Sequence, residues 1–159
     1  MPHPIGSIDL IAVGKIRSKP WQLAQADYEK RLGYYTRFNL VEVKDFVGRG
    51  QPDAVAMQKE GELLLKAAEG AGRIILLTPE GRRATSPGLA RYVQKQLEVY
   101  GRLAFLIGGP LGFSDPVTAA AHDQLSLSPL TFTHELARVI LLEQLYRAFT
   151  ILNNENYHK

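Results

Sequence analysis

Short apolar runs alternate with longer segments of helical periodicity along the whole chain. The apolar runs have the length of β-strands and lie at 8–13, 40–43, 74–78 and 103–107, with a weaker one at 125–127. The remaining segments repeat apolar residues at helical spacing and lie at 20–32, 53–68, 86–100, 115–121 and 134–152. Strands that alternate with helices predict an α/β domain built around a mostly parallel sheet.

Capping residues and glycines support these boundaries. Ser86 is predicted to cap the third helix, with Pro87 in its first turn, and Gly101 stands where a helix ends. Thr133 is predicted to cap the last helix. Glycine and proline in the segment 47–53 disfavour helix and strand alike, so we expect a loop there.

Composition narrows the function classes. The chain has 159 residues, enough for one domain, and 45% of them are hydrophobic. The absence of cysteine excludes disulfides, cysteine nucleophiles and thiolate zinc sites. None of the four histidines is spaced as a helical metal ligand, so no metal site is expected. No apolar run approaches the roughly 20 residues of a membrane span, and no secretion signal stands at the start, which predicts a cytoplasmic protein.

Positive charge is concentrated in the first third of the chain. The net charge is +3, and residues 15–49 hold eight Lys or Arg against four Asp or Glu. This excess can face nucleic-acid phosphates, or it can be the ordinary charge of solvated helices and loops.

Two segments are candidates for ligand binding because ligands usually lie beyond the carboxyl ends of parallel strands. The turn 107–112 (Ile-Gly-Gly-Pro-Leu-Gly) lacks the phosphate-loop and dinucleotide motifs, so it is either a plain tight turn or a ligand loop. The segment 77–81 (Leu-Thr-Pro-Glu-Gly) ends the preceding strand.

The uncharged segment 125–132 is predicted to be buried, with its backbone groups paired to a ligand or to neighbouring backbone.

The last helix is apolar on nearly every side. Its second apolar face predicts contact with another subunit, although Glu143 and Arg147 also suit an ordinary ion pair on a partly exposed face. The chain ends in Tyr157-His158-Lys159, which is either a frayed terminus or an aromatic and titratable group suited to a nucleobase.

Four separated motifs closely resemble the RlmH family of SPOUT-class methyltransferases. They are Phe-Leu-Ile-Gly-Gly-Pro-Leu-Gly at 105–112, Leu-Ser-Leu-Ser-Pro-Leu-Thr-Phe-Thr-His-Glu-Leu-Ala-Arg at 125–138, Glu-Gln-Leu-Tyr-Arg-Ala-Phe at 143–149, and the terminal Tyr-His-Lys. The likeness extends to Ile-Ala-Val-Gly-Lys at 11–15 and Tyr-Glu-Lys-Arg-Leu-Gly at 28–33, so it covers essentially the whole chain. Residues 1–159 are therefore expected to form one SPOUT domain, with 1–7 as a short N-terminal extension.

The resemblance implies an α/β fold with a C-terminal trefoil knot, an exception to the rule that chains avoid knots. It implies methylation of N3 of a pseudouridine in the 23S rRNA of the assembled ribosome, with S-adenosylmethionine as methyl donor, no metal, and a homodimer. By motif, the residues that contact the donor are Leu77, Gly108, Leu127, Ser128, Pro129, Leu130, Thr131 and Phe132.

Roles for the remaining motif residues follow from the chemistry of an imide. Arg147 can stabilise the developing imide anion, His158 can accept its proton, and Tyr157 can stack on the base. The residues expected to hold RNA phosphates are Arg138, Lys15, Arg17 and Lys19.

Two other functions are compatible with parts of this pattern. A non-catalytic RNA-binding module would use the basic surface of 15–49 but has no use for the uncharged segment 125–132. A nucleotide-binding enzyme of another class would need a phosphate at the glycine turn, and the absence of Lys and Arg between 103 and 137 disfavours one there.

Overall fold

The computed structural model describes residues 6–158, and the following bounds refer to that part of the chain. Strands and helices alternate in the order that the hydrophobic pattern predicts. The strands are β1 (Ser7–Val13), β2 (Arg37–Val43), β3 (Arg73–Arg82), β4 (Arg102–Ile107) and β5 (Asp123–Leu125). The helices are α1 (Lys19–Leu32), α2 (Asp53–Ala67), α3 (Ser86–Tyr100), α4 (Asp115–Ala120), α5 (His134–Leu152) and the short 3₁₀ helix η1 (Asn156–His158).

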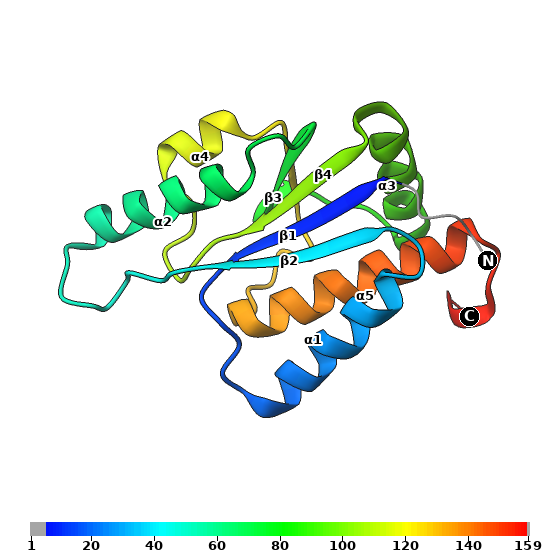
Figure 1. The fold of residues 1–159 in the computed structure, drawn as a ribbon, viewed down its shortest axis with the longest axis horizontal. Helices are drawn as coiled ribbons and strands as arrows, with labels where there is room; N and C mark the ends of the chain where they lie inside the picture. The colour runs from blue at the N-terminus through cyan, green and yellow to red at the C-terminus, as the bar shows by residue number, and fades with distance from the viewer. Residues whose placement is uncertain (1–5, 159) are drawn as a thin grey trace.

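All five strands join one parallel sheet in the order β2-β1-β4-β3-β5 (Figure 1). The sequence prediction of an α/β domain with a parallel sheet is therefore confirmed. Because the strands are parallel, the loops that follow them all emerge along the same edge of the sheet. The loops after β1 and β2 lie at one end of that edge, and those after β4, β3 and β5 lie at the other.

Helices cover both faces of the sheet, as parallel sheets require. Successive side chains of β1, such as Leu10 and Ile11, point to opposite faces and are fully buried. One face packs against α1, α3 and α5, which contributes Leu141 and Phe149, and the other packs against α2 and α4 (Figure 1). Burial of these two apolar layers stabilises the sheet and fixes its carboxyl edge.

Helix caps differ in one place from the prediction. Thr85, not Ser86, caps α3, because its side chain accepts the Gly88 N–H and Ser86 is already helical. The other caps are as predicted: the Thr133 hydroxyl accepts the Leu136 N–H, and Gly101 ends α3 with φ of +73°.

Other boundaries shift by a few residues. The β3 strand extends beyond 78 to Arg82 through a register shift against β5, and β5 itself lies two residues before the predicted 125–127. Residues 1–5 of the expected extension lie outside the described residues, and Ser7 belongs to β1.

Candidate functional site

A cavity of about 630 Å³ lies where β3, β4 and β5 end. Its walls are the turn 108–113 after β4, residues 76–80 of β3 where its pairing with β4 stops, and the segment between β5 and α5. Its size is that of a small-molecule site, and its position is the crevice where parallel sheets bind ligands. The two strand ends singled out in the sequence thus meet in one site.

The glycine turn is tightly packed. Gly112 has φ of +84°, and a one-residue bridge pairs Gly109 with Gly112. A Cβ on Gly108 would lie 3.1 Å from the Gly112 carbonyl oxygen and 3.3 Å from the Phe113 ring. A larger side chain at Gly108 would therefore press on the turn that forms this wall.

The segment 126–133 pairs part of its backbone internally. The Ser126 hydroxyl donates to the Ser128 carbonyl oxygen at 3.0 Å, and the Ser128 hydroxyl accepts the Leu130 N–H at 3.0 Å. Burial of the whole predicted segment 125–132 was a wrong prediction, because only Leu125 and Ser126 in it are buried and Leu130 is 71% exposed. The segment instead forms a turn whose tip reaches solvent at the mouth of the cavity.

The lining of the cavity contains no Lys or Arg. Its one carboxylate is Glu80, whose pKa is lowered chiefly by a hydrogen bond from the Thr78 hydroxyl and then by its own backbone N–H. Glu80 is therefore ionised at neutral pH and can accept hydrogen bonds from ligand hydroxyls. Sequence reasoning did not select Glu80, although it lies within the strand end flagged at 77–81.

Seven of the eight residues expected to contact a donor line this cavity, and Pro129 does not. The seven are Leu77, Gly108, Leu127, Ser128, Leu130, Thr131 and Phe132. Sequence reasoning missed Phe113, Gln124 and His134, which also line it. Phe113 directly follows the motif 105–112, and His134 lies within the motif 125–138 beside the cap Thr133, so these positions were the available signal.

The second group of expected site residues clusters near the C-terminal end of α5. Arg147 donates through Nε to the Glu143 carboxylate at 3.0 Å, and this hydrogen bond raises its pKa, so it stays cationic. The guanidinium lies 4.9 Å from the Tyr157 ring centroid. Tyr157 donates to Glu143 at 3.2 Å and packs edge-on against Tyr146 at 4.7 Å between ring centroids. The described part of the tail is therefore docked on α5.

Arg147 and the donor cavity are well separated within one chain. Ala137, on the first turns of α5, lines the cavity, and Arg147 follows ten residues later. At 1.5 Å per residue, the separation along the helix is about 15 Å. His158 is exposed beside Tyr157, also at the far end, so no single chain unites the two groups.

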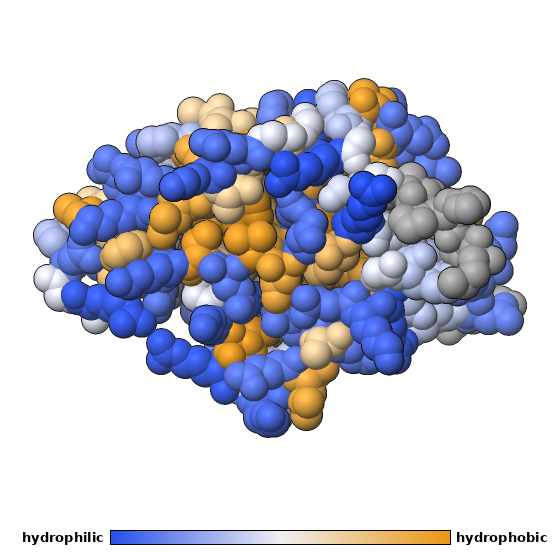
Figure 2. Space-filling view, viewed as in Figure 1, coloured by the Kyte–Doolittle hydropathy of each residue, from blue (hydrophilic) through white to orange (hydrophobic). Residues whose placement is uncertain are grey.

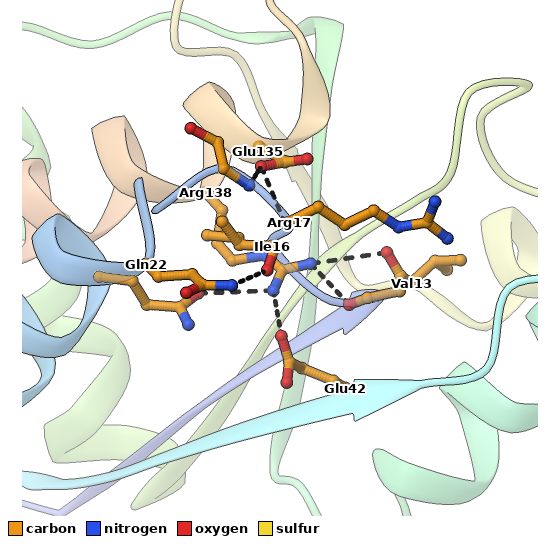
Figure 3. Close-up of polar contacts among 10 residues, drawn as sticks. Val13, Ile16, Arg17, Gln22, Glu42, Glu135 and Arg138 are labelled. Atoms are coloured by element: carbon orange, nitrogen blue, oxygen red, sulfur yellow. Dashed lines mark hydrogen bonds and ion pairs between the residues drawn. The ribbon is translucent and has the colours of Figure 1, made fainter. Parts of the chain in front are cut away.

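Arg138 does not fit its expected role of binding phosphate. Its side chain is 1% exposed and donates to the Glu42 carboxylate at 2.6 Å and to the Gly14 carbonyl oxygen at 2.9 Å (Figure 3). Since that guanidinium is held within the protein, it cannot reach a phosphate. The other three expected RNA contacts, Lys15, Arg17 and Lys19, are exposed.

Residues 6–158 hold neither a metal-ligand cluster nor a candidate membrane span. In this range no three His, Asp or Glu side chains are grouped as metal ligands would be. No helix in the same range has the length and apolar character needed to cross a membrane.

Comparisons with known proteins match nearly the whole chain. A family profile described as "Predicted SPOUT methyltransferase" matches residues 7–158. A protein named ribosomal RNA large subunit methyltransferase H, from Pelobacter propionicus, is 45% identical over 147 residues, covering 92% of this chain and 95% of its own. A protein of the same name from Halothermothrix orenii is 43% identical over 159 residues, and the match covers 96% of this chain and 99% of that protein.

A solved structure supports the same fold. The probable methyltransferase from Bordetella pertussis shares 17% sequence identity with this chain and has a TM-score of 0.56. The match covers 91% of this chain and 96% of that one. At this level of identity, the likeness concerns the fold alone.

Proposed function

Because this chain belongs to the SPOUT methyltransferase family, with relatives named ribosomal RNA large subunit methyltransferase H, we propose that it methylates 23S rRNA. The observation that carries the proposal is the glycine-walled cavity, lined by no Lys or Arg, at the ends of β3, β4 and β5. The acceptor in this proposal is N3 of a pseudouridine in the assembled ribosome, as the family resemblance implies. The ribosome would place the protein in the cytoplasm, and the C-terminal trefoil knot belongs to the same proposal.

The cavity residues fit S-adenosylmethionine. The cavity volume of about 630 Å³ accommodates a ligand of that size, and no Lys or Arg lines the cavity to repel the sulfonium of the donor. The Glu80 carboxylate can accept hydrogen bonds from ribose hydroxyls, while Leu77, Leu127 and Phe132 offer apolar surface to the adenine. When bound, this donor supplies an electrophilic methyl group, which leaves the chain to align the acceptor and exclude water.

A substitution at Gly108 tests the donor site. Gly108→Val places a branched side chain against the Gly112 carbonyl and the Phe113 ring, so the turn must shift. We expect calorimetry to show loss of S-adenosylmethionine binding while circular dichroism shows an intact fold. Gly33→Val, outside the cavity, is the control, since the Gly33 Cβ position has only ordinary contacts. If the Gly108→Val protein bound S-adenosylmethionine with undiminished affinity, this cavity would not be the donor site.

The methyl acceptor requires an acidic proton to leave N3. Arg147 is a permanent cation held by Glu143 and Tyr157, and it can stabilise the imide anion that forms. His158 is exposed, and its imidazole can accept the proton. Tyr157 can also stack on the base, using a ring that is only partly buried.

A homodimer would unite these groups with the donor cavity. Along α5 a half-exposed stripe runs through residues at helical spacing, namely Leu136, Ile140, Glu143, Arg147 and Ile151. Antiparallel packing of two such stripes would bring the partner's Arg147 toward the first turns of α5, where His134 and Ala137 line the cavity. Such an interface should bury more than about 1,200 Å² in total. Sedimentation at micromolar concentration that gives a 17.7 kDa monomer would refute the dimer.

Truncation after Asn156 tests the role of the tail. We expect S-adenosylmethionine affinity to stay nearly unchanged and methyl transfer to ribosomes to fall by about 10²-fold or more. Heterodimers of the truncated chain with Gly108→Val should regain activity, because one of their two sites keeps an intact cavity and an intact tail. Full activity of the truncated homodimer would show that the tail takes no part. Absence of recovery in verified heterodimers would argue against a shared site.

A further inference from the structure

A second cleft, of about 560 Å³, opens where β1 and β2 end. Its walls come chiefly from two loops, 14–18 after β1 and 44–52 after β2. Pro110 and His134 line both this cleft and the donor cavity, so the two are neighbours along the carboxyl edge of the sheet. Figure 2 shows the surface hollowed between the two loops, with hydrophilic side chains on both sides.

Each wall of the cleft carries cations. Lys15 and Arg17 on the first loop are exposed, and neither has a carboxylate partner among residues 6–158. Arg49 on the second loop pairs with Asp45 at 3.0 Å, with both side chains at least one third exposed. The lining of the cleft thus holds three cations against the two carboxylates of Asp45 and Glu135, directly beside the cavity proposed for the donor.

Each loop is also held by one carboxylate that accepts two consecutive backbone N–H groups. Glu135 Oε1 accepts the N–H of Arg17 at 3.2 Å and of Ser18 at 3.1 Å (Figure 3). Glu60 Oε2 accepts the N–H of Phe46 at 2.8 Å and of Val47 at 3.2 Å. Because both carboxylates are committed to backbone, neither loop is free to move independently of α5 or α2.

The same carboxylates adjoin two walls of the donor cavity. Glu60 is 3% exposed, and a Cβ on Gly109 would lie 2.9 Å from its Oε1, so Glu60 packs directly under the glycine turn. Glu135 is the second residue of α5, and His134 alone separates it from the segment 126–133. One carboxylate therefore links each basic loop to one wall of the donor cavity.

We propose that this cleft binds the sugar-phosphate backbone of the rRNA strand next to the methylated base. Glu60 and Glu135 act as positioning residues that fix the basic loops relative to the donor. This inference rests on the proposed function, since the strand must enter beside the donor. Lys15 and Arg17 supply the phosphate contacts, and Arg49 lines the opposite wall.

The charge contacts are tested with Lys15→Gln/Arg17→Gln. The matched control is Arg91→Gln/Lys95→Gln, which removes the same charge from exposed positions on α3. Binding to ribosomes and to a naked 23S rRNA fragment is measured over a range of salt concentrations. Two lost phosphate contacts should reduce the slope of log K against log salt by about 1.4 for a single strand. We also expect the KM for ribosomes to rise about tenfold with kcat within about twofold, and the donor Kd to be unchanged.

The positioning role is tested at Glu60. The Glu60→Gln side chain keeps one carbonyl acceptor for the two N–H groups, whereas Glu60→Ala keeps none. We expect Glu60→Ala to raise the KM for ribosomes and also to weaken donor binding, with Glu60→Gln intermediate in both. If Glu60→Ala fails to fold, the KM for ribosomes and the donor affinity of Glu60→Gln test the positioning role instead. A folded Glu60→Gln protein with wild-type KM and salt slope would overturn the positioning role.

The outcomes separate this inference from the proposed function. Ribosome binding is measured without turnover. A smaller slope of log K against log salt in the Lys15→Gln/Arg17→Gln protein therefore supports rRNA binding in the cleft even if no methyl transfer is found. A wild type that methylates ribosomes, together with a double variant that binds them equally well, would overturn the cleft alone. A slope change with whole ribosomes but not with the naked rRNA fragment would assign the cleft to a ribosomal protein and overturn the inference.

Discussion

Replacing Arg138 with methionine removes a buried guanidinium while keeping a side chain of comparable length. Arg138 is 1% exposed and pairs with Glu42, whose side chain is 25% exposed. The same guanidinium also donates to the Gly14 carbonyl oxygen, where β1 ends. The substitution therefore leaves a carboxylate and a carbonyl without their donor.

Removing one partner of a buried ion pair costs about 3–5 kcal/mol. Glu42 is partly exposed and can regain water, and Arg138 Nε is already buried without a partner among the described residues. Both facts place the expected decrease in the free energy of unfolding at the lower end of that range, at about 3 kcal/mol. That is a large part of the roughly 5–15 kcal/mol that stabilises a domain, and it should lower Tm by about 6–12 °C.

Chemical and thermal denaturation measure the effect. The control is Arg91→Met, an exposed arginine on α3, which should change the free energy of unfolding by less than about 0.5 kcal/mol. In a double-mutant cycle, Arg138→Met with Glu42→Gln should cost less than the sum of the single changes. A loss below about 1 kcal/mol would contradict a structural role for Arg138. A reduced salt slope of ribosome binding in a well-folded variant would restore the phosphate role.

Two further substitutions probe the sheet. Gly81→Ala would place Cβ 2.7 Å from the Leu125 backbone, so pairing of β3 with β5 should weaken by about 2 kcal/mol, whereas Gly33→Ala should be nearly neutral. Tyr92→Phe loses the 2.7 Å bond to Asp123 and should cost about 1 kcal/mol, or about 3 °C in Tm. Burial and, after it, the hydrogen bond to Asp123 raise the pKa of Tyr92 in the folded protein. The loss of stability in Tyr92→Phe relative to wild type should therefore be fully present below about pH 10, where an unfolded tyrosine begins to ionise, and should shrink at higher pH.

Much of the fold was accessible from the sequence because local and tertiary preferences agree. Strand-sized apolar runs such as 103–107 are buried on both faces, and caps such as Thr133 mark helix ends directly. The candidate donor site followed from one geometric rule, that parallel strands bring their following loops to a common edge. That rule placed 77–81 and 107–112 together before any contact was known.

The remaining features depend on contacts that no local pattern encodes. Arg138 is a cation on a helix, and only the folded chain brings Glu42 and the Gly14 carbonyl around it. Glu60 and Glu135 look like ordinary surface acids in the sequence, yet each holds a distant loop. The tip of 126–133 is exposed because its serines satisfy neighbouring backbone groups, which the absence of charge could not show.

The proposed reaction is methyl transfer to 23S rRNA at the cavity formed by β3, β4 and β5. The most direct measurement is mass mapping of 23S rRNA from cells lacking the gene, before and after their ribosomes are incubated with the purified protein and S-adenosylmethionine. We expect one additional methyl group on N3 of a single pseudouridine, present with wild-type protein and absent with Gly108→Val. An rRNA whose mass map is unchanged by active, donor-binding protein would contradict it.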